Sequence, residues 1–259
     1  MNVEITFSQA NLEYYLLILV RMASFVYISP FFGQNNVPQR VKLGLSLFLA
    51  FIVYSILPKE TLEYTTTLGY AELVVRESIA GLLIGFSAYI CNTIILFAGK
   101  LIDMQIGLAM ANLFDPITRT QVSVTGNMYQ YILLLLLIAT GMYSFLLSAI
   151  VDSYSIIEIG GMHMTQTLYE NMMGFMVDYF VIGFRINLPI FAIILILDCA
   201  MGIMTKVASQ IHMFSVGMQI KILGGFLILF LTVFLLPDIA NFIFVNMQDM
   251  VIATIRGMR

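Results

Sequence analysis

Six long hydrophobic segments, separated by short polar ones, dominate the sequence. They cover residues 14–32, 43–57, 73–98, 128–151, 173–200 and 222–247. A helix that crosses the hydrocarbon core of a bilayer needs roughly 20 apolar residues, and most of these segments approach or exceed that length. The pattern therefore predicts an all-α integral membrane protein with about six hydrophobic helical segments.

The composition excludes an ordinary soluble domain. Hydrophobic residues make up 60% of the 259 positions and charged residues only 10%, and the mean hydropathy is +0.95. Soluble domains are about half apolar and a quarter charged. The chain has no basic tract that would indicate nucleic acid, and no motif of a hydrolase, a nucleotide-binding loop or a zinc peptidase. We therefore expect no enzyme activity, no cofactor and no metal.

The basic residues of the polar segments predict a topology with which the basic residues near the C-terminal end conflict. Lys and Arg concentrate in the polar segments 33–42, 99–119 and 201–221, which the positive-inside rule places in the cytoplasm. Both termini would then lie outside, yet the C-terminal end carries Arg256 and Arg259. Two explanations remain open: the last hydrophobic segment, which Pro-Asp interrupts at 237–238, is a hairpin that does not cross, or the chain is not a simple series of spans.

Several ionisable side chains lie inside the hydrophobic segments, where each costs about 2.5–3.5 kcal/mol at a lipid-facing helix centre. Asp178 and Arg185 are seven residues apart and so share one helix face. They are candidates for a proton or ion relay, or for ion pairs between helices or subunits. We favour ion pairs, because relays usually place more carboxylates at mid-span. The full set of assembly or ion-pair candidates is Arg21, Arg40, Lys42, Glu77, Asp178, Arg185, Asp198, Lys206, Gln210, Gly217 and Lys221.

The segment 99–126 is polar and rich in helix-breaking residues, although long hydrophobic runs flank it. Gly107, Pro116 and Gly126 interrupt regular helix, and Asn112 and Asp115 add polar groups that hydrocarbon cannot satisfy. Such a backbone is tolerated at membrane depth only where protein buries it or where it lines an aqueous path. The segment indicates a pore or a gate.

Five stretches, distributed over nearly the whole chain, resemble one known family. They are Ser29-Pro-Phe-Phe-Gly33, Val37-Pro-Gln-Arg-Val-Lys-Leu-Gly44, Arg76 to Phe86, Gly99 to Pro116, and Asp198 to Lys206 with the following Gln210, Phe214, Gly217 and Lys221. On these motifs the chain resembles the FliR family of flagellar type III export proteins. It departs from the family at Ser209 and Gln219, where members often have proline.

The resemblance implies a function and a set of partners. A FliR-like protein joins FliP and FliQ, with FlhB and FlhA as neighbours, in a gate that is closed at rest and passes unfolded flagellar proteins. It lies in the bacterial inner membrane, in lipid contact, at the flagellar basal body. Its fold resembles a FliP-like part, here about 1–200, fused to a FliQ-like hairpin, here about 201–259. The equivalent injectisome subunit remains an alternative.

The same resemblance implies a closed-state plug at residues 107–124. The plug residues would be Gln105, Gly107, Met110, Asn112, Leu113, Phe114, Asp115, Pro116 and Gln121. The apolar members would seal a constriction, and the polar members would hold the closed form by hydrogen bonds. Alternatively, this loop only holds subunits together. The resemblance also suggests that the stretch 206–221 forms a cytoplasm-side kink that faces FliQ or FlhB.

A second class of function stays open at this point. The charged residues and broken segments also suit a small-solute secondary transporter. A third interpretation, an assembly scaffold with no lumen-facing part, predicts that Gln105, Asn112 and Gln121 tolerate substitution without leak.

Overall fold

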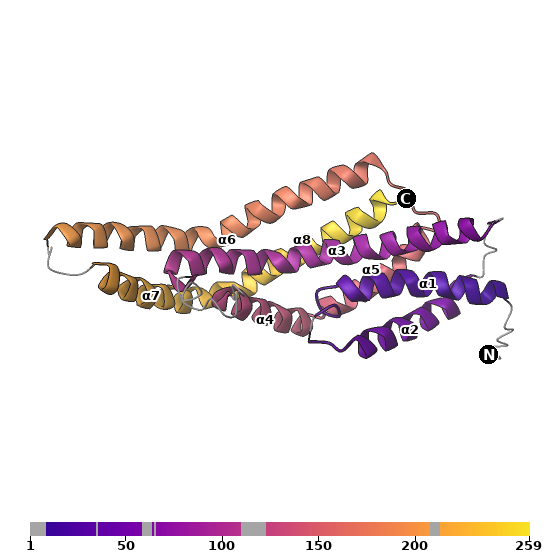
Figure 1. Ribbon diagram of the computed structural model, residues 1–259, viewed down its shortest axis with the longest axis horizontal. Coiled ribbons are helices and arrows are strands. Elements are labelled where there is room, and N and C mark those ends of the chain that lie inside the picture. The colour runs from indigo at the N-terminus through magenta and orange to yellow at the C-terminus, as the bar shows by residue number, and fades with distance from the viewer. Residues whose placement is uncertain (1–8, 35, 59–63, 65, 110–122, 208–212) are drawn as a thin grey trace. The chain divides into compact units, whose positions relative to one another are not determined.

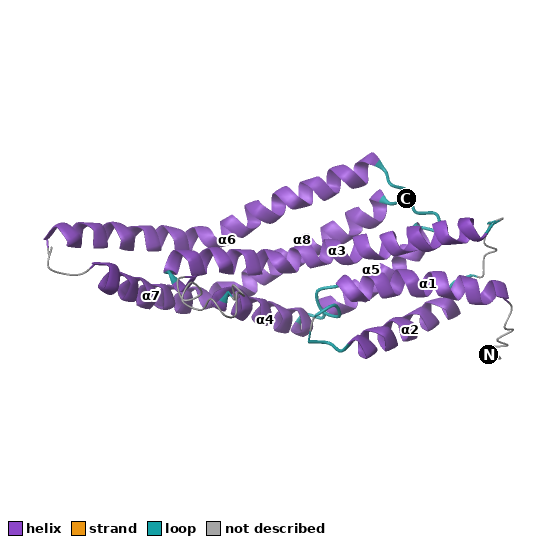
Figure 2. Cartoon of the chain, in the orientation of Figure 1, coloured by secondary structure: helices purple, strands orange, loops and turns teal. Residues whose placement is uncertain are grey.

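The computed structural model describes the chain apart from residues 1–8, 35, 59–63, 65, 110–122 and 208–212, and all regular structure in the described part is helical (Figures 1 and 2). The elements are α1 (Gln9–Ile28), α2 (Gln39–Ile56), α3 (Thr67–Ile106), α4 (Val124–Ala139), α5 (Met142–Ile156), α6 (Gln166–Val207), α7 (Met213–Thr232), the 3-10 turn η2 (Val233–Leu235) and α8 (Leu236–Gly257). Five candidate membrane spans are present in the described residues, or six if the bent pair α4–α5 counts as one. The all-α membrane prediction is confirmed.

The chain divides into two compact units. Unit 1 consists of Met1–Ile90, Gly141–Phe175 and Asn246–Arg259, and unit 2 consists of Cys91–Thr140 and Met176–Val245. Helices α3, α6 and α8 therefore contribute residues to both units. The division into FliP-like and FliQ-like parts near residue 200 concerns a family resemblance and stays a prediction.

The hydrophobic segment 128–151 forms two helices instead of one. Helix α4 ends at Ala139, α5 begins at Met142, and the two are bent by 71° at the break. Gly141 adopts φ +72, a left-handed conformation that glycine reaches without steric cost. The Thr140 hydroxyl donates to the carbonyl oxygen of Leu136 at 2.8 Å and so satisfies one of the last carbonyls of α4. The bend follows from this local Thr-Gly pair.

The last hydrophobic segment is interrupted where the sequence places Pro237, but it does not turn back. The 3-10 turn η2 joins α7 to α8, and Pro237 lies in the first turn of α8, where a missing N–H costs no helical hydrogen bond. Residues 216–257 together form one candidate span of 42 residues. The hairpin explanation for this segment is therefore wrong.

Unit 1 is built around α1 and the helices that pack on it. Helix α2 packs on α1, where the Tyr15 hydroxyl donates to the carbonyl of Leu47 at 3.2 Å and the Tyr15 and Tyr54 rings meet edge to face. The entry to α6 is tied to the end of α8, since the backbone N–H of His163 donates to the carbonyl of Met258 at 3.0 Å. This backbone hydrogen bond to the residue that follows α8 thus helps to hold the chain ahead of α6.

Unit 2 is built from the C-terminal part of α3, most of α6, helices α4 and α7, η2 and the first part of α8. The Phe97 ring of α3 lies 5.4 Å from the ring of Tyr179 and 5.5 Å from that of Phe180, both on α6. Helices α6 and α7 are joined by an ion pair between Asp198 and Lys221. Aromatic packing and one ion pair therefore fix α6 between its neighbours.

Candidate functional site

A fully buried ion pair lies at the centre of unit 1. Arg21 of α1 donates from Nε to one carboxylate oxygen of Glu77 at 2.6 Å and from Nη2 to the other at 2.9 Å. Both side chains are 0% exposed. A bidentate arginine–carboxylate pair is strong and fixed in direction, and in a buried place the removal of either partner leaves an uncompensated charge.

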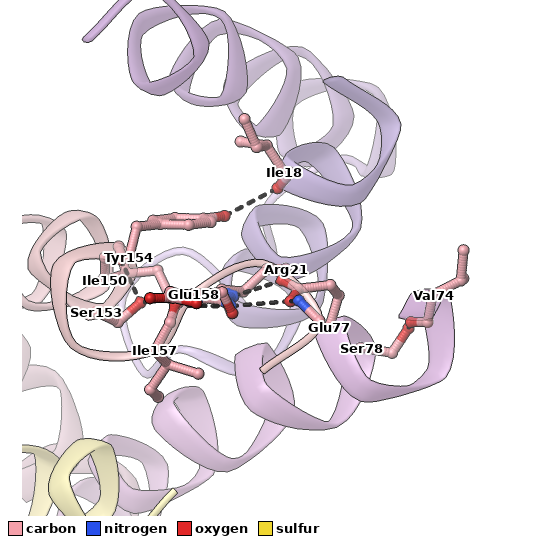
Figure 3. A network of polar contacts seen from close by, with 11 residues as sticks. Ile18, Arg21, Val74, Glu77, Ser78, Ile150, Ser153, Tyr154, Ile157 and Glu158 are labelled. Carbon is pink, nitrogen blue, oxygen red and sulfur yellow. Dashed lines mark hydrogen bonds and ion pairs between the residues drawn. The ribbon is translucent and has the colours of Figure 1, made fainter. Parts of the chain in front are cut away.

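The same pair binds the turn that follows α5. Arg21 donates to the carbonyl oxygens of Ile157 and Glu158 at 3.3 and 3.4 Å (Figure 3). Glu77 accepts the backbone N–H of Gly160 at 2.8 Å. The last carbonyls of a helix have no partner within it, and Arg21 supplies one from another helix. Gly160 has φ +81, so the turn needs glycine at this position.

Two further side chains complete this cluster. The guanidinium carbon of Arg21 lies 4.2 Å from the centre of the Tyr154 ring, a cation–π arrangement. The Tyr154 hydroxyl donates to the carbonyl of Ile18 at 3.1 Å, and the Ser153 hydroxyl oxygen accepts from Arg21 Nη1 at 3.3 Å. Every buried polar group of the cluster therefore has a partner, which suits a structural fixing point that joins α1, α3 and α5.

A second buried polar cluster, in unit 2, joins the end of α3 to the start of α4. Asp103 is 4% exposed. One of its carboxylate oxygens accepts the Ser123 hydroxyl at 2.6 Å, and the other accepts the backbone N–H of Thr125 at 3.2 Å. The Ser123 oxygen in turn accepts the N–H of Gly126 at 2.9 Å, as an N-cap does. We call Asp103, Ser123, Thr125 and Gly126 the stem.

The backbones of α3 and α4 meet at Gly126 of the stem. A Cβ placed on Gly99 would overlap the backbone of Gly126, and one placed on Gly126 would overlap the Ser123 hydroxyl and crowd the carbonyl oxygen of Leu96, so both positions need glycine. Gly107, directly after α3, has φ +93 and ends the helix in a left-handed conformation. The stem therefore holds Ser123 against the last turns of α3, from which the chain departs at Gly107.

Most of the predicted plug lies outside the described residues. This applies to Met110, Asn112, Leu113, Phe114, Asp115, Pro116 and Gln121. Gln105 and Gly107 are described. Gln105 lies in the last turn of α3 with its Oε1 buried and without a hydrogen-bond partner among the described residues. The assignment of these nine residues to a plug stays a prediction.

The structure brings some of the other candidate residues together. Asp198 and Lys221 form an ion pair at 2.8 Å, and both are partly exposed. Lys42 is buried on α2, where its ammonium donates to the carbonyl of Gly33 at 2.8 Å. Gly217 is buried in α7.

Other candidates stay apart. Asp178 and Arg185 are both exposed on α6, and no ion pair joins them in the described part of the chain. Arg40 and Lys206 are exposed as well, and Gln210 lies outside the described residues. The shared helix face of Asp178 and Arg185 thus does not bring their charges into contact.

The sequence analysis did not select Asp103, Ser123, Ser153 or Tyr154. Asp103 was placed in a polar connecting segment, whereas it lies in the last turn of a 40-residue helix. One signal was available: the serine at 123 precedes a hydrophobic run, as N-cap residues do. Nothing in the local sequence marks Ser153 or Tyr154, because their roles depend on a contact with Arg21.

The fold and the two buried clusters define a membrane protein that is helical throughout its described part and that buries Arg21, Glu77 and Asp103 in hydrogen-bonded clusters. Comparison with known proteins narrows the class. The model of the family described as bacterial export proteins, family 1, matches residues 12–247. The chain therefore belongs to this family, the FliR family of flagellar export-apparatus components.

Several characterised relatives share almost their full length with the chain. The chain is 28% identical over 251 residues to the flagellar biosynthetic protein FliR of Bacillus subtilis (strain 168), which covers 95% of this chain and 93% of the relative. It is 26% identical over 231 residues to the FliR protein of Escherichia coli (strain K12), covering 89% and 87%. The FliR protein of Aquifex aeolicus (strain VF5) is 24% identical over 217 residues, covering 84% of each chain.

Proposed function

We propose that the chain is a subunit of the flagellar protein export gate, in which it completes a pore with FliP and FliQ and contributes residues 107–124 as a closed-state plug. The family membership supports a role in the export apparatus. The partners, the pore and the plug are inferences beyond it. FlhB and FlhA are the proposed neighbours, unfolded flagellar proteins the proposed cargo, and the bacterial inner membrane at the basal body the proposed location.

The stem is the observation that carries the plug proposal. The connection between α3 and α4 begins at a left-handed Gly107 and ends at Ser123, which the buried Asp103 holds. A connection that only had to join two helices would need a few residues, and this one has seventeen. When both ends of a long connection are fixed, the connection can reach only a limited set of positions. A plug needs this restriction, because it has to return to the same constriction after each opening.

The exposed apolar surface supports assembly with other membrane proteins. Helices α6 and α2 bury only 28% and 22% of their apolar windows inside the chain. Helix α2 turns Lys42 and Ser46 inward and leaves Phe48 and Phe51 exposed. A contiguous apolar face of this kind is covered by lipid or by a partner. No observation favours the transporter alternative over the export gate, and the named relatives are flagellar, which favours the flagellar branch over the injectisome.

The test is to express the chain with its genomic neighbours, purify the complex in mild detergent and weigh it by native mass spectrometry. We expect one copy of this chain with several copies of two smaller membrane proteins. A lone monomer, recovered while the neighbours are present and stable, would contradict the assembly.

The plug is tested separately in that complex. Deleting residues 108–122 should leave the assembly mass reduced only by the deleted residues and should let small ions leak through reconstituted vesicles. The control replaces the same residues with a Gly-Ser linker of equal length, which keeps the connection but not its side chains, and this variant should leak as well. A correctly assembled deletion that stays as tight as the wild type would rule out the plug.

A further inference from the structure

Two helix interruptions face each other in unit 2. Pro189 lies inside α6 and cannot donate to the carbonyl of Arg185, so one helical hydrogen bond is missing there. On the opposite side, α7 gives way to α8 through η2, which ends at Leu235. Pro189 and Leu235 line the same two cavities, of about 380 and about 20 Å³. The points at which each helix bends most easily thus lie at one level.

The larger cavity is an open, apolar groove that carries two opposite charges. Arg185 contributes from α6 and Asp238 from α8, and the remaining lining side chains, such as Ile182 and Ile239, are apolar. Both charged side chains are exposed. In the described part of the chain neither makes a side-chain hydrogen bond or an ion pair. In this structure the two charged side chains do not meet, and the groove between them is open.

Two unpaired charges beside apolar surface are costly, and bringing them together removes part of that cost. Opposite charges attract strongly where water is scarce, and arginine has a long side chain that can span a groove. The smaller cavity beside the groove is lined by the buried side chains of Tyr129, Ile190 and Leu236. This packed base is suited to stay together while the groove above it narrows.

We propose that Arg185 and Asp238 form an ion pair that closes the groove between α6 and α8, with Pro189 and η2 as the two hinge points. The chain then has two states in unit 2: the open one described here, and a closed one in which the pair is made. The partner of Arg185 is thereby Asp238 on another helix, and not Asp178 on its own helix. This inference does not depend on the plug or on the identity of the partner subunits.

The experiment measures how fast a cysteine in the groove reacts with a maleimide. The reporter is Ile239→Cys in a Cys199→Ser background, since Cys199 is exposed and Cys91 is buried. The full-length protein is used, both alone and with its co-expressed neighbours. Arg185→Gln and Asp238→Asn should each raise the labelling rate several-fold, because either removes the pair. The exchanged variant, Arg185→Asp with Asp238→Arg, should return the rate to that of the parent.

Asp178→Asn is the matched control, since it neutralises an exposed acid of α6 that does not line the groove. It should leave the rate unchanged. The proposal is overturned if neither neutral variant changes the rate, if the exchanged variant labels as fast as they do, or if Asp178→Asn has the effect of Asp238→Asn. Should the exchanged variant fail to fold, as judged by its elution profile, the two neutral variants still decide.

Discussion

Gly99 of α3 and Gly126 of α4 meet backbone against backbone, so that a Cβ on Gly99 would overlap the Cα of Gly126. Backbone atoms cannot move aside as a flexible side chain can. We expect Gly99→Ala to lower the free energy of unfolding by about 1–3 kcal/mol, the usual cost of overpacking. Thermal unfolding of the purified protein in detergent measures the change.

Gly44 provides the control for this substitution. It lies inside α2, and a Cβ there would meet nothing within 4 Å. Gly44→Ala should therefore raise the unfolding free energy by about 0.5–1 kcal/mol, because alanine restricts the unfolded chain more than glycine does. Equal effects of the two substitutions would show that the contact between α3 and α4 is not tight.

Neutralising Glu77, the buried carboxylate of unit 1, should strongly lower the free energy of unfolding. Glu77→Gln leaves the guanidinium of Arg21 buried without its counter-charge, and we expect a loss of about 3–5 kcal/mol in unfolding free energy. Glu72→Gln is the matched control, because Glu72 pairs with Arg76 at 2.5 Å while 61% exposed. Its cost should stay below about 1 kcal/mol.

A paired replacement distinguishes the loss of a charge from the loss of packing. If the cost of Glu77→Gln comes from the stranded charge, then Arg21→Met with Glu77→Leu should be more stable than Glu77→Gln alone. A double variant that is the least stable of all would assign the effect to the hydrogen bonds with the 157–160 turn instead. Proteolysis near that turn, followed by mass spectrometry, reports on it directly.

The stem should matter more for the impermeability of the complex to ions than for its assembly. Asp103→Ala removes the acceptor of both Ser123 and Thr125, which loosens the start of α4 against α3. We expect the assembled complex to keep its mass but to leak ions several-fold faster in vesicles. Met104→Ala, a change at the neighbouring position that is 67% exposed, should leave the leak at the parental rate.

The outcome for the stem is separable from that for the plug. If the 108–122 deletion leaks ions and Asp103→Ala does not, the plug hypothesis stands, but the stem is not the anchor of the plug. If Asp103→Ala fails to assemble, Ser123→Ala serves instead, because it removes the hydrogen bonds of Ser123 to Asp103 and Gly126 and leaves the carboxylate bound to Thr125.

The buried end of α8 should contribute to the stability of unit 1. Met258 is fully buried, whereas the adjacent Arg259 is exposed. Met258→Ala should cost about 2–5 kcal/mol of unfolding free energy, as for other buried large-to-small changes. Arg259→Ala should change it by less than about 0.5 kcal/mol. Similar melting temperatures for both variants would show that the last residues do not pack on the entry to α6.

The positions of the helices were predictable because apolar runs of this length have few alternatives in or beside a membrane. The hydrophobic segments 14–32 and 173–200 overlap α1 and α6. The break between α4 and α5 was not predicted, since Gly141 lies in an otherwise uniform apolar run. A single glycine is tolerated within many helices, so only the bent structure reveals its effect.

Contacts between residues distant in the sequence were harder to predict. Arg21 and Glu77 were each selected as charges that need compensation, but the pattern could not pair them across 56 positions. Asp178 and Arg185 were linked only by helical periodicity, which is the one geometry a sequence displays directly, and the favoured interpretation, ion pairs between helices or subunits, named no partner for either. Asp103 escaped notice for a related reason: its partners follow a connection whose length and course are not encoded in any local period.

The length of α3 and α6 has a consequence for how the cell must handle this polypeptide. At 40 and 42 residues they are about 60 Å long, twice the roughly 30 Å of hydrocarbon, and a tilt of 40° would absorb only about 10 Å of the surplus. Helix α3 finds most of its neighbours inside the chain, whereas α6 buries only 28% of its apolar window there, so about 20 Å of α6 needs a partner protein. A copy synthesised in excess of its partner proteins would leave this apolar part of α6 uncovered, and we expect such a copy to aggregate or to be degraded.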